Sequence, residues 1–304
     1  RITMDLLTRV LFTLLGLFII LNWGLLMNAI MRKLTARVAR RVGIRWYQPW
    51  INLVKLYSNR NSIEHGVMFQ LGPVFRLLGG LGLMIFMPLI YGSEYFSNFS
   101  FAGDLVIILY IKFFGMLGMA LGAGEGGHPY SAMGVSRGLS QVTVVELPFT
   151  LAVIALAVQY NTLSLHEIVA AQQGGITNWT LFTNPVATLA AVLSMLGIFM
   201  HSPFDLVRAP NEIPIGPPTE YHSSYLGILR TNAAILHVIE AILFMNLFFG
   251  GATSWPILII KTFLIYFISI LVGVVFPRFR IEQSVSWFLR VPLILGIIAI
   301  ILIL

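Results

Sequence analysis

Long apolar segments alternate with short polar ones along the chain. Eight of these segments approach or exceed the roughly 20 residues that a helix needs to cross a bilayer. They cover residues 5–31, 72–91, 104–122, 139–160, 185–206, 225–249, 256–276 and 287–304. Because a backbone in lipid must satisfy its own hydrogen bonds, apolar runs of this length predict α-helices. We therefore expect an all-α, polytopic membrane protein in which residues 1–304 form a single membrane domain of eight transmembrane helices.

Basic residues are concentrated in the loops on one side of these segments. Loop 32–65 is rich in Lys and Arg, and alternate loops on the same side add Arg137, Arg208, Arg278, Arg280 and Arg290. Loops 92–103, 161–184 and 250–255 contain no Lys or Arg. Positively charged loops remain in the cytoplasm. The pattern therefore predicts a multi-pass protein of the cell membrane with both termini outside.

Three cytoplasmic loops are expected, over residues 32–65, 123–137 and 202–224. The first is basic and amphipathic, and its apolar residues are suited to the lipid interface: Trp46, Tyr47, Trp50, Leu53 and Leu56. On the opposite side, Ser164 and Glu167 have the spacing of a capping box. This spacing predicts a short helix over residues 164–172.

The composition agrees with a membrane location and limits the chemistry of the chain. Apolar residues make up 58% and charged residues 10%, whereas a soluble domain has roughly 25% charged residues. The mean hydropathy is +0.87. A soluble domain, a disordered chain and a nucleic-acid-binding domain are therefore excluded, and the bilayer is the expected surroundings. The chain has no cysteine, so any iron–sulfur cluster must lie in a partner.

Several ionisable residues nevertheless fall inside the apolar segments, where each costs at least ~2.5–3.5 kcal/mol to insert. They are Lys112, Glu146, Arg230, His237, Glu240 and Lys261, with Asp205 at the end of the fifth segment. One interpretation is structural, with Lys112 or Lys261 paired to Glu146 or Glu240 to hold helices together. The other is a chain of titratable groups and water that conducts protons or another ion. The residues alone leave both open.

The segment after the fifth span carries the most specific motif in the sequence. Residues 202–221 resemble the signature of the NADH dehydrogenase subunit 1 family of respiratory complex I. Ten positions match in register: Pro203, Phe204, Asp205, Leu206, Ala209, Glu212, Gly216, Thr219, Glu220 and Tyr221. The block from Pro129 through Arg137 and Gln141 to Glu146 also resembles the family, as do Arg32, Lys33, Arg37 and Arg41 in the first cytoplasmic loop.

This resemblance implies a membrane foot on which a hydrophilic redox arm docks. A buried acidic funnel would link the electron-accepting site to antiporter-like membrane subunits, and its matching carboxylates are Glu146, Asp205, Glu212 and Glu220. Lys112, His237, Glu240 and Lys261 join them as candidates for the ion path, while Arg37, Arg41, Arg137 and Arg208 are candidates for docking the arm. Expected partners are hydrogenase-like large and small subunits that hold iron–sulfur clusters and, in hydrogenases, a nickel–iron site. The chain itself would hold no metal and no cofactor.

The departures from the family pattern bear on quinone binding. Arg208 and Pro210 replace acids in the signature, and Ala233 stands where the family often has a carboxylate, with Glu240 two turns on along the same face. These changes favour the relatives that take electrons from ferredoxin without quinone, namely membrane-bound hydrogenases and sulfur-reducing complexes. Two alternatives remain: the quinone-binding subunit of a complex I-type NADH or ferredoxin dehydrogenase, and an autonomous ion transporter. A transporter usually shows matched half-repeats, which we do not find.

Overall fold

The computed structural model describes residues 6–61, 65–207, 212–213 and 215–303. Throughout these residues the regular structure is helical, as the apolar runs predict. The long helices are α1 (Leu6–Val38), α3 (Val67–Phe86), α4 (Asp104–Glu125), α5 (Pro129–Tyr160), α9 (Ser223–Phe248) and α10 (Trp255–Val275). Two short helices, α11 (Ile281–Arg290) and α12 (Pro292–Ile301), follow one another with Pro292 at the break.

Seven helical segments in the described residues are long and apolar enough to cross a membrane. The fifth expected span is the exception, because its helix α8 (Pro185–Ile198) has only 14 residues. The chain leaves the helix at Phe199 and continues through Pro203 as an irregular segment, since proline cannot continue a helical hydrogen-bond ladder. The eighth crossing and the outside position of both termini remain predictions.

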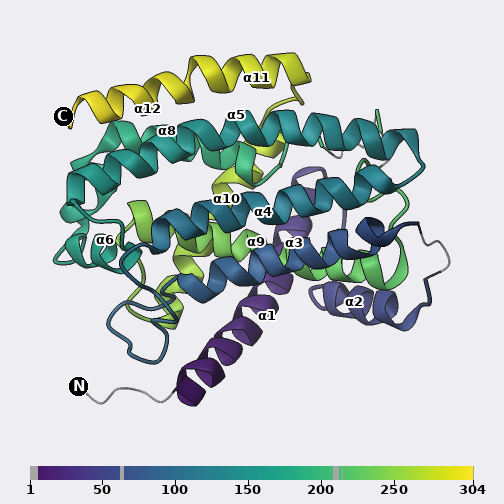
Figure 1. Ribbon diagram of the computed structural model, residues 1–304, viewed down its shortest axis with the longest axis horizontal. Helices are drawn as coiled ribbons and strands as arrows, with labels where there is room; N and C mark the ends of the chain where they lie inside the picture. Colours follow the sequence, from purple (N-terminus) through teal and green to yellow (C-terminus); the bar gives the residue numbers. More distant parts are fainter. Residues whose placement is uncertain (1–5, 62–64, 208–211, 214, 304) are drawn as a thin grey trace.

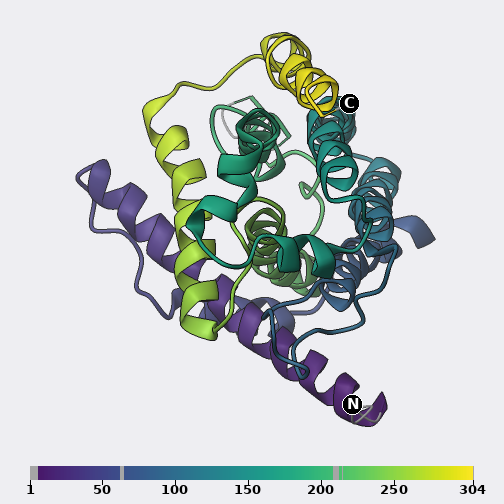
Figure 2. The ribbon, with the colours of Figure 1, turned by 90° about the vertical axis from the view of Figure 1, so that its left-hand side faces the viewer.

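Helix α9 lies in the middle of the bundle and is the most buried of the candidate spans. The other long helices surround it (Figure 2), and it contacts α1, α2, α3 and α10 directly. Helices α11 and α12 run along α5 at one edge, while the first half of α1 projects beyond the bundle at the other (Figure 1). Helices α3 and α4 pack closely through glycine: a Cβ on Gly79 would lie 2.7 Å from the Cα of Gly115. Such small residues let helices approach in a membrane.

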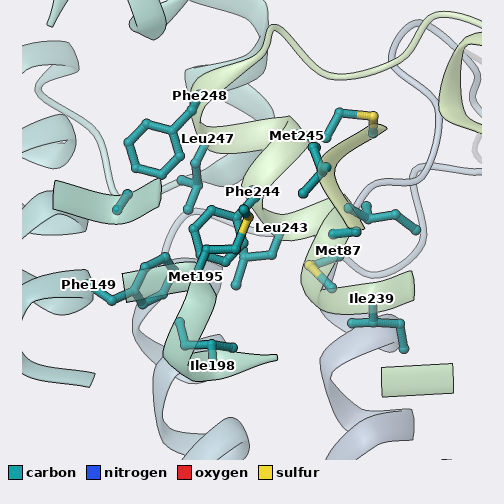
Figure 3. Close-up of a cluster of buried hydrophobic side chains, with 14 of the residues drawn as sticks. Met87, Phe149, Met195, Ile198, Ile239, Leu243, Phe244, Met245, Leu247 and Phe248 are labelled. Atoms are coloured by element: carbon teal, nitrogen blue, oxygen red, sulfur yellow. The ribbon is translucent and has the colours of Figure 1, made fainter. Parts of the chain in front are cut away.

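The largest hydrophobic cluster surrounds the second half of α9. Phe244 packs against Phe149 of α5, with ring centroids 5.1 Å apart, and against Phe199 at the end of α8. Met195 of α8 and Leu243 of α9 belong to the same cluster (Figure 3). Because lipid is as apolar as these side chains, close packing rather than removal from water holds the helices together.

Four shorter helices complete the fold: α2 (Gln48–Ser58), α6 (Leu165–Ala171), η1 (Ile176–Asn178) and α7 (Thr180–Thr183). Helix α2 occupies the expected amphipathic loop and none of its residues is fully buried. The Trp50 indole donates to Asn22 Oδ1 of α1 at 3.0 Å, and the Tyr57 hydroxyl lies 2.9 Å from the Thr231 hydroxyl of α9. These contacts hold α2 alongside the bundle.

Two local predictions need correction. The capping box at Ser164 is wrong, because the Ser164 side chain makes no cap bond. Instead the Leu165 amide donates to the Asp104 carboxylate at 2.8 Å, and the Thr162 hydroxyl donates to Glu167. The expected loop 123–137 is mostly helical as well, since α4 ends at Glu125 and α5 begins at Pro129.

Candidate functional site

A cavity of about 170 Å³ lies between α3, α4, α5, α9 and the irregular segment after α8. Most of its wall is apolar, with Met116, Met119 and Phe199 among the lining residues. Its polar side chains come from separate elements and converge on the same space: Arg76, His201, Asn232, His237 and Glu240. The volume gives room for several water molecules.

Two of these polar side chains are buried without a hydrogen-bond partner among the described residues. They are Asn232, through Oδ1, and Glu240, through Oε1, with 3% and 2% of each residue exposed. An unpaired buried polar group costs about 1–3 kcal/mol and a charged one more. Their place on the cavity wall makes this the polar region of an otherwise apolar bundle.

Lys112 and Glu146 form an ion pair next to this cavity. The Lys112 Nζ lies 2.9 Å from Glu146 Oε1, and only 2% of the lysine side chain is exposed against 20% of the glutamate side chain. The ammonium also lies 4.7 Å from the centre of the Phe149 ring. Arg76, Lys112 and Glu146 all act electrostatically on Glu240. The structure therefore brings four charged residues from α3, α4, α5 and α9 into one cluster.

Lys261 lies apart from this cluster. Its Nζ donates to the Phe249 and Gly251 carbonyls, both at 2.7 Å, and lies 4.2 Å from the centre of the Trp179 ring. These carbonyls follow the C-terminus of α9, where a cation is favourable. The structure thus pairs Lys112 with a carboxylate and gives Lys261 backbone partners instead.

The signature segment is held by ion pairs to three different parts of the chain. Asp205 faces Arg278 at 3.4 Å before α11, Glu212 pairs with Arg137 of α5, and Glu220 lies 3.2 Å from His65 before α3. The Gln141 amide also donates to the Phe204 carbonyl at 2.6 Å. The segment is therefore tied to both flanks of the cavity.

The four candidate docking arginines have different surroundings. Arg37 and Arg41 are exposed at and just beyond the end of α1. Arg137 is held within the chain by Glu212. Arg208 lies outside the described residues. The exposed pair therefore offers the available positive charge at this position.

Tyr221 closes the signature segment against α3. Its hydroxyl donates to the Phe69 carbonyl at 2.9 Å, and the two rings stack with centroids 4.3 Å apart. Burial raises the pKa of the Tyr221 hydroxyl, and the neighbouring Glu125, Tyr225 and Glu220 raise it further. Sequence reasoning missed Glu125, which accepts from the Phe69 amide at 2.6 Å. Its position at the C-terminus of α4, unfavourable for its own helix dipole, is a signal that could have indicated a partner elsewhere.

A hydrogen-bonded group of three aromatic side chains was also missed. Tyr266 of α10 lies 2.9 Å from His201 Nε2 and 3.4 Å from His237 Nδ1 through its hydroxyl. The sequence had indicated only a surface or supporting role for His201. A tyrosine hydroxyl inside an apolar span was the available signal, because such a group usually finds a partner when buried.

Metal binding finds no support in the part of the chain that the structure describes, where no cluster of three His, Asp or Glu side chains could hold an ion. The arrangement is instead that of an integral membrane protein with a polar cavity, a buried charge cluster and an ion-paired signature segment. This combination defines a membrane subunit that handles charge and leaves redox chemistry to others.

The comparisons with known proteins agree with this class. The NADH dehydrogenase family model matches residues 10–304, so the chain belongs to that family. It is 29% identical over 289 residues to a membrane component of NADH-quinone oxidoreductase from Syntrophobacter fumaroxidans, covering 87% of this chain and 86% of the relative. It is 27% identical over 291 residues to the corresponding component of NADH-quinone oxidoreductase from Desulfotalea psychrophila, covering 86% of each.

A solved structure is similar over nearly the full length. It is a chain of the membrane-bound sulfane sulfur reductase, an archaeal respiratory membrane complex. The TM-score is 0.86 at 30% identity, covering 97% of this chain and 99% of that chain. The protein is therefore a multi-pass membrane subunit of a complex I-type respiratory complex, and it works together with other subunits.

Proposed function

We propose that this chain is the coupling subunit of a ferredoxin-driven respiratory complex of the membrane-bound hydrogenase or sulfur reductase type. It docks the hydrophilic redox arm and links electron transfer to translocation of protons or sodium ions. The observation that carries the proposal is the Glu240 carboxylate, which is buried and unpaired at Oε1 on a cavity wall beside the Lys112–Glu146 pair.

The physical argument starts from the cost of that arrangement. A buried carboxylate is stable only when it is paired, solvated or neutralised, and this cavity has room for the water that would solvate it. Lys112 lies between two carboxylates, so a change in the charge of one alters the proton affinity of the other. Such a cluster passes a change in protonation from Glu240 to Glu146 without moving the helices far.

The signature segment supplies the connection to electron transfer. Asp205, Glu212 and Glu220 lie on the segment that the family uses below its redox arm, and all three are ion-paired here. A change of charge in a docked arm would act first on these pairs and then on the cavity. Arg37 and Arg41 would contact the arm from the exposed end of α1. Iron–sulfur clusters, and nickel–iron in a hydrogenase, would lie in the hydrophilic partners.

The test is Glu240→Gln in the whole complex, reconstituted in vesicles and driven by reduced ferredoxin. We expect ions translocated per electron to fall about tenfold or more, as for other essential proton-transfer groups, while the detergent-solubilised complex still transfers electrons. Glu94→Gln, on an exposed acid of a distant loop, is the matched control. Unchanged translocation in Glu240→Gln and Glu146→Gln together would make the chain a passive anchor.

The terminal acceptor requires a separate measurement. The 30% identity to a sulfane sulfur reductase chain over 97% of this chain supports a quinone-free complex. Metal analysis of the purified complex distinguishes the two branches, because iron with nickel indicates a hydrogenase and iron without nickel a sulfur reductase.

A quinone-binding role is the second candidate. It is favoured by the relatives that are named as parts of NADH-quinone oxidoreductase and by the apolar wall of the cavity. Organic extraction of the purified complex decides between them: one quinone per complex supports this role, and none supports the ferredoxin-driven complex without quinone.

A further inference from the structure

Tyr266 joins two histidines that face the same cavity. His201 follows α8, His237 lies on α9, and both line the cavity wall. Tyr266, with 3% of its surface exposed, lies behind them on α10. Its hydroxyl is 2.9 Å from His201 Nε2 and 3.4 Å from His237 Nδ1. One hydroxyl therefore touches a ring nitrogen of each histidine.

The three rings are held in place by their neighbours. The Tyr266 ring centroid lies 5.2 Å from each histidine ring, and 5.3 Å from the Phe199 ring in an edge-to-face contact. The two histidine rings are themselves 5.7 Å apart. Packing of this kind restricts the rings to one arrangement, so the hydroxyl is oriented before any proton moves.

The bridge connects the two parts of the proposed coupling path. His201 is four residues before Asp205, and the Phe279 amide donates to the Pro203 carbonyl between them. His237 is one helical turn before Glu240, on the same face of α9. The chain of groups therefore runs from the signature segment, through Tyr266, to the buried acid in the cavity.

We propose that Tyr266 is a proton-relay residue between His201 and His237. This inference rests on the function proposed above. Protonated His201 gives its Nε2 proton to the Tyr266 oxygen while the Tyr266 hydroxyl proton passes to His237 Nδ1. His201 becomes neutral, His237 becomes a cation, and the tyrosine is neutral before and after. One proton moves, no electron is transferred, and Glu240 then accepts the proton through water in the cavity.

The longer contact marks the controlled step. A distance of 3.4 Å exceeds the roughly 2.5–3.2 Å that is usual for protein hydrogen bonds, so His237 must approach the hydroxyl by a few tenths of an ångström. Helices α9 and α10 carry the two partners, and their relative position sets this distance. A purely structural hydroxyl would be satisfied by the 2.9 Å bond to His201 alone.

The test is Tyr266→Phe in the reconstituted complex, which removes the hydroxyl and keeps the ring packing. We expect ions translocated per electron to fall about threefold or more, whereas electron transfer in detergent stays within about twofold. Tyr160→Phe is the matched control, because it removes a hydroxyl that lies 3.0 Å from the Thr180 hydroxyl at the other end of the bundle. The control variant should leave the ratio unchanged.

The outcomes separate the relay from the proposed function. If Glu240→Gln abolishes translocation and Tyr266→Phe does not, the coupling role stands and the relay is wrong. If neither variant changes the ratio, both are wrong. Should Tyr266→Phe fail to assemble, 3,5-difluorotyrosine at position 266 keeps the hydroxyl and makes it more acidic. A translocation rate changed by more than about twofold supports the relay, and an unchanged rate overturns it.

Discussion

The two ends of the helix bundle satisfy their buried polar groups to different degrees. The sealed end consists of the loops 87–103, 161–184 and 249–254, and the cavity half consists of the cavity wall and residues 201–222. At the sealed end, Gln172 donates to the carbonyls of Ile168, Asn246 and Leu247 and accepts from the amides of Thr180 and Gly250. In the cavity half, the buried side-chain oxygens Asn232 Oδ1 and Glu240 Oε1 have no hydrogen-bond partner within the described ranges.

The difference shows where this fold is rigid and where it responds to charge. Irregular backbone near a membrane must be paired by side chains or water, and at the sealed end the Gln172 amide pairs five backbone groups by itself. Unpaired oxygens are costly, and these two occur where a cavity offers room for water. The sealed end therefore fixes the helices, while the cavity half has groups whose protonation can change.

The largest expected effect on stability comes from Gln172→Met. This change keeps the volume but leaves two backbone amides and two inter-element carbonyls without their partner, at a cost of about 3 kcal/mol or more. We expect a clear drop in the melting temperature of the purified complex in detergent. Gln173→Met, which removes only the bonds to Val169 and Gly250, should lower it less. Equal losses in the two variants would contradict the special position of Gln172.

The two buried lysines give the next largest effect and divide the two halves directly. Lys261→Met removes a charged donor from two carbonyls and should cost about 2 kcal/mol of stability, without changing ions translocated per electron. Lys112→Met should instead lower that ratio, because Glu146 loses its partner and Glu240 loses a nearby positive charge. Melting temperature and translocation, measured on both variants, provide the comparison. A loss of translocation in Lys261→Met would place that lysine in the ion path after all.

These lysines also show what sequence could and could not predict. The apolar runs predicted helical segments correctly because hydropathy is a local property of the chain. Lys112 and Lys261 look equivalent in sequence, each a lone cation in an apolar span, and only the packing of distant helices gives one a carboxylate and the other two carbonyls. The helical start at Pro129 was missed because residues 130–137 form no long apolar run, and hydropathy does not register a helix that continues beyond its apolar part.

The site was predictable in its acids and not in their partners. Glu146, Asp205 and Glu220 were found from motif and membrane position. Their partners come from other parts of the chain, as the Asp104 cap on α6 does from 61 residues away. Tyr266 carries no motif, and its role depends on two histidines from different elements.

The smallest effect is expected at Tyr221, which is the well-packed exception in the cavity half. Tyr221→Phe loses the hydrogen bond to the Phe69 carbonyl and should cost about 1 kcal/mol at neutral pH. The stacked ring remains, so the complex should still assemble. Tyr110→Phe, on a side chain that is 74% exposed, is the control and should leave the melting temperature unchanged.

The pH dependence makes this last prediction sharper. Burial and the nearby Glu125 raise the pKa of Tyr221 above its ordinary value of 10.0, so the folded protein keeps the proton at a pH where the unfolded chain releases it. Stability is therefore fully present below about pH 10 and is lost as the pH rises further, because the folded state binds more protons. The melting temperature of the unsubstituted protein should fall more steeply above this pH than that of Tyr221→Phe, and the two curves should approach each other. Parallel curves would mean that the Tyr221 hydroxyl is hydrated, and that the signature segment is open to water at the one place where the structure packs it most tightly.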